Sequence, residues 1–264
     1  IDKLTPVELE HFLQREFSLK PEDTYRVPGP VNLSRLMQLC NSDSRPDLLF
    51  PDYRAPVPAP FDRVGDKPAE LFEAVAEQDR LLHHPYQSFQ PVIDFLTAAA
   101  LDPDVMAIKQ TIYRTGEDSE LMKILLAAAR AGKEVTVVVE LMARFDEQTN
   151  INWASKLEEV GAHVVYGVVA HKTHAKMAVV LRREKGRLRR YAHLGTGNYH
   201  PRTARLYTDF GLLTADPKLC EDMDKVFAQL TGLGARRSLK ALMQSPFTMH
   251  DGMVALIRAE ARAA

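Results

Sequence analysis

The stretch Glu134-Val-Thr-Val-Val-Val-Glu-Leu141 decides the fold, because so many adjacent β-branched residues are typical of a strand buried on both faces. The preceding run Val105–Tyr113 has the same character, and a helix over about 118–131 separates the two. On the other side, a helix over about 150–160 leads into a third strand at 163–168. A glycine follows each helix and ends it. This alternation predicts an α/β domain with a mostly parallel sheet covered on both faces.

The alternation gives way to a hairpin pattern after residue 170. Ala175–Arg183 and Leu188–Thr196 are predicted to form two strands around a turn at Lys185-Gly186. With this hairpin added, the fold class we predict is α/β with a mixed sheet flanked by helices. The other expected elements are a short strand at 211–214 and helices at about 69–77, 88–100, 217–230 and 251–264.

The N-terminal part of the chain is different in character. Residues 5–8, Thr-Pro-Val-Glu, have the form of a capping box and predict a helix to about Phe17. Asn32 is expected to cap a second helix to Leu39, and residues 44–68 are rich in proline. We therefore expect three parts: a small helical segment at 1–50, a Pro-rich extended connector at 51–85 and one α/β domain at 86–264.

The composition is that of an ordinary globular protein, with 45% hydrophobic and 26% charged residues among 264. The sequence has no apolar run of the roughly 18 residues that a membrane span needs, and no leader of signal-peptide type. Cys40 and Cys220 are far apart, which predicts free thiols in a reducing cytoplasm. A P-loop pattern is absent, and no pair of His, Cys or carboxylate residues has metal-ligand spacing.

Positive charge is concentrated in one region. Residues 171–205 contain ten Lys or Arg residues against a single acid, Glu184, although the whole chain has a net charge of −1. Such a local field attracts anions. For the part between Arg182 and Arg190, an equally weighted alternative is a solvated hairpin tip without a function.

His174-Ala175-Lys176 carries the strongest chemical signal. On an extended strand, residues two apart share a face, so the imidazole and ammonium groups would point the same way. An ordinary histidine, with a pKa of about 6.5, is mostly neutral at pH 7 and can attack phosphorus through a free lone pair. A lone histidine on an apolar strand is more often a hydrogen-bonded core residue, but Lys176 and the basic surroundings favour catalysis.

A glycine-rich turn follows about twenty residues later, at 195–198 (Gly-Thr-Gly-Asn). Its glycines let the backbone approach an anion closely, and Asn198 adds a neutral donor beside Gly197. The polar loop that follows contributes Arg205 and Tyr207 as further candidates for binding the substrate. Tyr207 could stack on a nucleobase or donate to phosphate, with ordinary packing as the alternative.

Two arginines, Arg114 and Arg144, follow predicted strand ends. Ligands of parallel sheets bind beyond the carboxyl ends of the strands, so the two guanidinium groups would form a bidentate clamp for phosphate. The alternative is a surface ion pair with Glu117 or Asp146.

Segments in order along nearly the whole chain carry a family resemblance: 25–30, 83–86, 108–114, 139–146, 174–176, 191–198 and 203–209. Together they resemble bacterial polyphosphate kinase of the first class. The resemblance implies an ATP:polyphosphate phosphotransferase that works reversibly through a phosphohistidine at His174. It also implies that Tyr207 contacts ATP and that Arg114 and Arg144 lie at Mg²⁺, the expected cofactor. Because a guanidinium has no free lone pair for a cation, we interpret both as phosphate clamps beside the ion.

The catalytic core of this family looks like phospholipase D, with two similar halves that face each other. The resemblance implies that this chain ends before the second half, so we expect little or no activity from it alone. The expected partners are ATP, ADP and polyphosphate, with homo-oligomers of the full-length protein and no nucleic acid. The expected location is cytoplasmic, with peripheral membrane association left open.

Two alternatives from other classes remain. One is a polyphosphate- or nucleotide-binding module without turnover. The other is a phospholipase D-type phosphodiesterase that works as a symmetric dimer. Phospholipase D has an aspartate five residues after the lysine, where this chain has Leu181, which argues against the diesterase.

Overall fold

The computed structural model describes residues 1–39, 45–63, 67–114, 116, 118–141, 143, 147–168, 171–232 and 238–263. These residues group into two compact units, Ile1–Tyr53 and Arg54–Ala264. Within the described ranges we find no helix whose length and hydrophobicity would let it span a bilayer.

Among its described residues, the first unit contains helix α1 and short 3₁₀ helices. Helix α1 spans Val7–Glu16, close to its predicted range. Pro6 is its N-cap residue and has no N–H for a capping-box acid to accept from, so the predicted capping box is wrong. Asn32 precedes a 3₁₀ helix without capping it, because its Oδ1 accepts from Ser34 Oγ at 2.6 Å. The 3₁₀ helices are Pro21–Asp23, Leu33–Gln38 and Pro46–Leu48.

The second unit contains a seven-stranded sheet in the order β1-β7-β6-β5-β2-β3-β4. The strands are β1 (Arg80–His84), β2 (Val105–Ile112), β3 (Glu134–Val139), β4 (His163–Tyr166), β5 (Lys176–Glu184), β6 (Arg187–Gly195) and β7 (Asp209–Thr214). The prediction of a mixed sheet is confirmed. Only the pairs β2–β3 and β3–β4 are parallel, so "mostly parallel" is wrong for the sheet as a whole. The difference arises because β5, β6 and β7 follow one another as antiparallel neighbours, β5 runs antiparallel to β2, and β1 adds antiparallel to β7.

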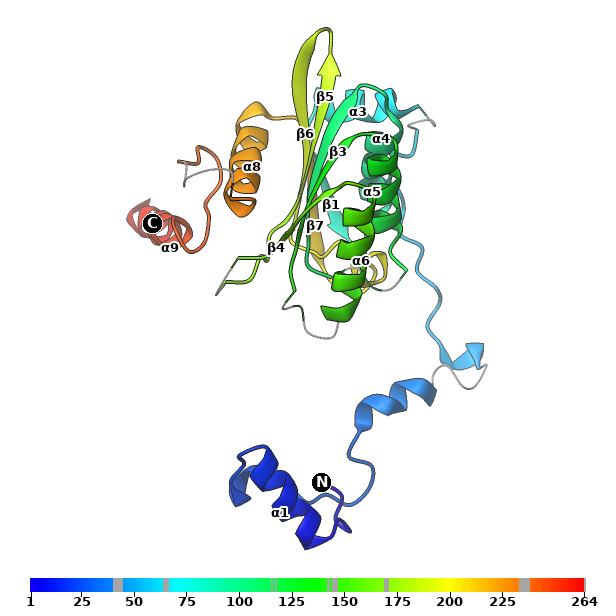
Figure 1. Cartoon of the computed structure of the whole chain (residues 1–264), viewed down its shortest axis with the longest axis vertical. Coiled ribbons are helices and arrows are strands. Elements are labelled where there is room, and N and C mark those ends of the chain that lie inside the picture. Colours follow the sequence, from blue (N-terminus) through cyan, green and yellow to red (C-terminus); the bar gives the residue numbers. More distant parts are fainter. Residues whose placement is uncertain are drawn as a thin grey trace. The chain divides into compact units, whose positions relative to one another are not determined.

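Helices cover both faces of the sheet (Figure 1). One face packs against α3 (Pro68–Glu77), α4 (Gln90–Leu101), α5 (Glu120–Arg130) and α6 (Glu147–Glu159). The other packs against α8 (Pro217–Leu230). Helix α5 begins where the sequence predicts, because Ser119 Oγ caps it by accepting from Met122 N at 3.3 Å. The remaining helices are α7 (Pro201–Ala204) and α9 (Met249–Ala263).

Two elements were not anticipated from the sequence. Strand β1 adds antiparallel to β7, with Leu82 opposite Gly211 and His84 opposite Asp209. Helix α7 is a single turn in the loop after the glycine-rich turn, with the ring of His200 accepting from Thr203 N at 3.1 Å. Both elements border the edge of the sheet where the candidate site lies.

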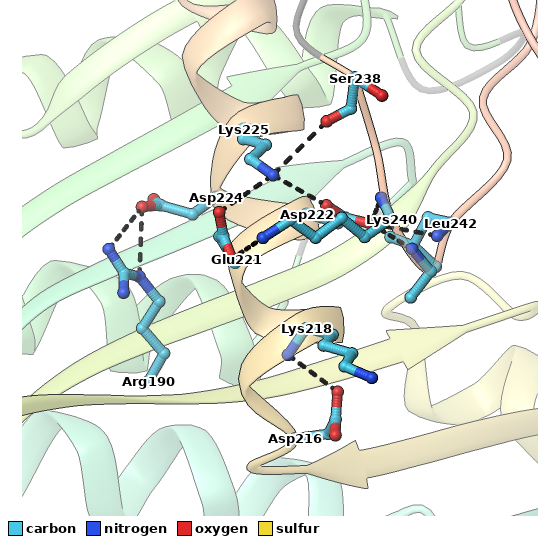
Figure 2. A network of polar contacts seen from close by, with 11 residues as sticks. Arg190, Asp216, Lys218, Glu221, Asp222, Asp224, Lys225, Ser238, Lys240 and Leu242 are labelled. Carbon is cyan, nitrogen blue, oxygen red and sulfur yellow. Dashed lines mark hydrogen bonds and ion pairs between the residues drawn. The ribbon is translucent and has the colours of Figure 1, made fainter.

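Helix α8 is held by a network of charged groups (Figure 2). Asp224 bridges the helix to the sheet through Lys109 Nζ at 2.6 Å and Arg190 Nη2 at 3.0 Å. Asp222, which is fully buried, accepts from the backbone amides of Lys240 and Ala241 at 2.6 Å and Leu242 at 3.2 Å. Its carboxylate therefore fixes the segment after α8 against the helix.

We expect Asp222→Asn to destabilise the protein by about 2 kcal/mol at pH 7, because hydrogen bonds to a charged group are worth roughly 1.5–3 kcal/mol. Burial raises the pKa of Asp222, but the backbone amides and Lys225 lower it overall. Its stabilisation is therefore present above the unfolded-state pKa and lost as the pH falls through the lowered folded-state value. Urea unfolding of both proteins between pH 7 and pH 3 measures this. Glu221→Gln, an exposed neighbour, should have little effect, and a constant difference across this pH range would contradict the argument.

Candidate active site

One edge of the sheet gathers the residues that the sequence singles out. The parallel strands β2 and β3 end there, with Ile112 opposite Val139. Strand β5 begins there and β6 ends there, with Lys176 opposite Gly195. Because β2 and β5 are neighbours in the sheet, the residues just before β5 lie beside the residues just after β2. This is the carboxyl edge of the parallel strands, where ligands bind in open α/β sheets.

His174 and Lys176 meet around the ring of Tyr113, which follows β2. The imidazole packs edge-on against Tyr113, with 4.9 Å between ring centroids and 81° between planes. Lys176 Nζ lies 5.1 Å from the centroid of the same ring and donates to the His174 carbonyl at 2.6 Å. The Lys176 side chain is buried, whereas His174 is exposed. The predicted proximity of imidazole and ammonium is therefore present, although β5 begins only at Lys176 and His174 precedes the strand.

The surroundings of His174 and Lys176 lower the pKa values of both side chains. Burial, followed by the charges of Lys176 and Lys172, lowers the pKa of His174. Burial also lowers the pKa of Lys176 to about 8, against the opposing effect of Asp209. At neutral pH the imidazole is therefore neutral and keeps a lone pair, while most of the Lys176 side chains are still charged.

Backbone hydrogen bonds hold the segment that carries His174. Thr173 N donates to Glu140 Oε2 at 2.6 Å, and Thr111 Oγ1 donates to the carbonyl of Ala175 at 2.7 Å. Glu140 is only 2% exposed. We did not single out Glu140 from the sequence, although a carboxylate directly after a run of buried valines was the available signal.

The glycine-rich turn is fixed by Asp209 at the start of β7. Thr196 Oγ1 donates to Asp209 Oδ1 at 2.8 Å and accepts from Phe210 N at 2.9 Å. A Cβ at Gly197 would lie 2.5 Å from Asp209 Oδ2, so this close approach requires glycine. The negative charge of Asp209 partly opposes the lowering of the Lys176 pKa by burial, so this carboxylate lies near the candidate site. Asp209 is not among the site residues that the sequence predicts.

The other predicted site residues are less tightly gathered. Arg114 lies two residues after β2 and is half-buried, whereas Arg144 falls outside the described residues. The clamp formed by both therefore stays a prediction. Arg205 and Tyr207 follow α7 and are exposed, Tyr207 by 63%, and their side chains hydrogen-bond to no other described residue. Asn198 lies at the turn with its Oδ1 buried.

The basic stretch is divided between two ends of the sheet. The hairpin tip lies at the end of β5 opposite to Lys176. There, Arg182 Nε contacts Asp102 at 2.9 Å and Arg182 Nη1 contacts Glu184 at 2.8 Å, and Arg190 pairs with Asp224. Part of the hairpin's charge is thus structural, and the charges that act on His174 are those of Lys176 and Lys172.

Family comparison agrees with this arrangement. The family described as polyphosphate kinase C-terminal domain 1 matches residues 70–236, which include every strand of the sheet. This chain belongs to the polyphosphate kinase family. A polyphosphate kinase from Burkholderia ambifaria is 61% identical over 260 residues, and one from Paraburkholderia phytofirmans is 60% identical over 261 residues. In both cases 97% of this chain matches 37% of the relative, so the chain spans little more than a third of its curated relatives.

Solved structures give the same fold. The crystal structure of polyphosphate kinase from Porphyromonas gingivalis superposes with a TM-score of 0.76 at 30% identity, over 97% of this chain and 39% of that chain. Nuc, a phospholipase D family member from Salmonella typhimurium, reaches a TM-score of only 0.47 at 17% identity. The fold of polyphosphate kinase is thus well matched, whereas the second likeness is too low to bear on function.

Magnesium, expected for a polyphosphate kinase, finds no ligand set of its own in the described part of the chain. No group of three or more His, Cys, Asp or Glu residues there could hold a metal ion. Asp209 accepts from Thr196, and Glu140 is buried under the Thr173 amide. The described residues therefore offer no ligand set for a protein-bound Mg²⁺, and the cofactor stays a prediction.

The low pKa of His174 can be measured directly. We expect ¹³C-labelled His174 to titrate below the ordinary value of about 6.5. Lys176→Met should raise the pKa, because it removes a nearby positive charge, and Lys172→Met should raise it less. NMR titration of the imidazole Cε1 signal measures all three. A His174 that titrates above 6.5, or an unchanged value in Lys176→Met, would refute this electrostatic description.

Proposed function

We propose that this chain carries the nucleophile of an ATP:polyphosphate phosphotransferase, with His174 as the residue that is phosphorylated. The supporting observation is the neutral, exposed imidazole that packs on Tyr113 at the carboxyl edge of the parallel strands, with Lys176 bonded to the carbonyl of the same residue. The close relatives are polyphosphate kinases, which supports polyphosphate and ATP as substrates. Because the chain spans 37% of those relatives, the activity of the whole protein is part of the proposal.

The proposed reaction has two reversible displacements. A ring nitrogen of His174 attacks the γ-phosphorus of ATP, the bond from that phosphorus to the β,γ-bridging oxygen breaks, and ADP leaves. A terminal oxygen of polyphosphate then attacks the same phosphorus, and the N–P bond breaks to regenerate the imidazole. The ammonium group of Lys176 stabilises the negative charge on the transferred phosphoryl group in the transition state, and so lowers the activation barrier of the transfer.

The remaining residues have binding roles in this proposal. Gly197 and Asn198 receive phosphate oxygens at the turn, and Arg114 and Arg144 clamp the chain of phosphates. Tyr207 and Arg205, both exposed, bind ATP from the segment after α7. The proposal further includes Mg²⁺ carried by the substrate phosphates, a homo-oligomeric full-length protein, a cytoplasmic location and no nucleic-acid partner.

Labelling with ATP that carries ³²P at the γ-position tests the nucleophile. We expect an acid-labile, base-stable label in the native polypeptide that carries this sequence, and complete loss of it in His174→Ala. His171→Ala is the matched control, since His171 is also exposed and lies three residues earlier. Label retained in His174→Ala would overturn the assignment.

The same experiment separates the alternatives. Retention of polyphosphate without label in the native protein would indicate a binding module. Cleavage of a phosphodiester substrate would indicate a phospholipase D-type enzyme, which Leu181 argues against.

The arginine clamp has its own test. Arg114→Lys and Arg144→Lys should each weaken polyphosphate binding roughly tenfold, because a point charge cannot replace two parallel hydrogen bonds from a planar fork. Filter binding of labelled polyphosphate measures this, with Arg187→Lys at the distant hairpin tip as the control. Unchanged affinity in both variants would remove the clamp from the proposal.

A further inference from the structure

Three buried polar atoms converge behind the glycine-rich turn. His84 Nε2, His193 Nε2 and Asn198 Oδ1 are buried and have no hydrogen-bond partner among the described residues. His84 is 3% exposed and His193 is 2% exposed. All three residues line one narrow cavity, together with Gly211. Unpartnered polar atoms are costly in a protein interior, so three at one place need an explanation.

The cavity has room for one water molecule. Its volume is about 10 Å³, which is the smallest space that a water can occupy. Glycine at position 211 keeps it open, because a Cβ there would lie 2.8 Å from His193 Nε2 and 3.3 Å from His84 Nε2.

In each ring, the hydrogen bond of Nδ1 determines whether Nε2, which faces the cavity, is a donor or an acceptor. His84 Nδ1 lies 3.0 Å from the carbonyl oxygen of Gln87, which can only accept. His84 Nδ1 must therefore carry the proton, and in the neutral ring Nε2 is an acceptor. Burial lowers the pKa of His84, and burial and His84 lower that of His193 to about 3, so both rings are neutral at pH 7.

His193 Nε2 is a hydrogen-bond donor to the cavity in only one of the two neutral tautomers. Its Nδ1 lies 2.8 Å from the hydroxyl of Tyr199, which can donate or accept. If Tyr199 donates, His193 Nε2 carries a proton and faces the cavity as a donor. The three unpartnered atoms are then one donor and two acceptors, His84 Nε2 and Asn198 Oδ1. Asp209 also lines the cavity, and its Oδ1 already accepts from Thr196. A water molecule satisfies all three, since it accepts one hydrogen bond and donates two. A phosphate oxygen would satisfy only the donor.

We infer that one ordered water bridges His84, His193 and Asn198, and that His84 is a positioning residue for the glycine-rich turn. This role rests on the proposed function, because the turn is the part that would receive phosphate. The chain of hydrogen bonds runs from Tyr199 through His193 and the water to His84 and the Gln87 carbonyl. It thereby links β1 to β6 and the adjoining turn, which lie more than 100 residues further along the chain.

The tautomers can be observed without any turnover. In ¹⁵N NMR of the native polypeptide, we expect His84 in the Nδ1–H form and His193 in the Nε2–H form at pH 7. A crystal structure at high resolution should show a single water within hydrogen-bond distance of the three atoms. His193 in the Nδ1–H form, a protonated ring, or a metal ion detected at this place by elemental analysis would overturn the inference. These results stand whether or not His174 is phosphorylated.

Variants then test the positioning role. Gly211→Ala fills the water position, and His84→Leu removes an acceptor; each should raise KM for ATP about tenfold, as loss of a buried hydrogen bond predicts. Labelling of His174 at saturating ATP should persist. A variant that is merely unfolded would instead show a lower kcat together with a lower thermal midpoint. His83→Leu is the matched control, since His83 instead stacks on Phe210 at 4.6 Å. Unchanged KM in both folded variants would refute the positioning role.

Discussion

The antiparallel pairing of β5 with β2 is the constraint on which the candidate site depends. It brings the start of β5, with Lys176, next to the end of β2, where the Tyr113 ring receives both His174 and Lys176. A slip of one residue would turn Lys176 to the opposite face of the sheet. Contacts at both ends of β5 oppose such a slip: Thr111 Oγ1 bridges Ala175 O and Met177 N at one end. Arg182 pairs with the nearly buried Asp102 at the other. The register is thus fixed by polar contacts as well as by the core.

Charge is distributed unevenly along the same strand. At the hairpin end, the guanidinium groups of Arg182 and Arg190 are neutralised by carboxylates of the protein. At the site end, Lys176 is buried with Asp209 as the nearby negative charge, and its pKa is lowered to about 8. A bound anion would favour the protonated form of Lys176, so anion binding and proton uptake by Lys176 are coupled here. Arg182 and Arg190 on this hairpin are thus paired with carboxylates, whereas Lys176 makes no ion pair with any other residue that the structure describes.

The sequence predicts best those elements that depend on interactions between neighbouring residues. The valine run of β3, the hairpin turn and the Ser119 cap depend on neighbours in sequence, and each was found close to its predicted place. The contributions of Glu140 and His84 depend on contacts with residues far along the chain, and no local pattern shows them. Strand β1 illustrates this well, since Arg80–His84 becomes a strand through pairing with β7 about 130 residues later. The capping box failed for a different reason, because Pro6 occupies the cap itself and offers no amide.

The way in which His174 is held agrees with the role of a nucleophile. Its neighbours are fixed through the backbone: Glu140 accepts from Thr173 N, Thr111 donates to Ala175 O, and Lys176 donates to the carbonyl of His174 itself. No ring nitrogen of His174 is hydrogen-bonded to another described residue, whereas the rings of His84 and His193 are each anchored through Nδ1. A nucleophilic lone pair must remain unshared until the substrate arrives, while a structural imidazole must share its own. These three histidines thereby have two different roles: His84 and His193 stabilise the scaffold, and His174 is left to react.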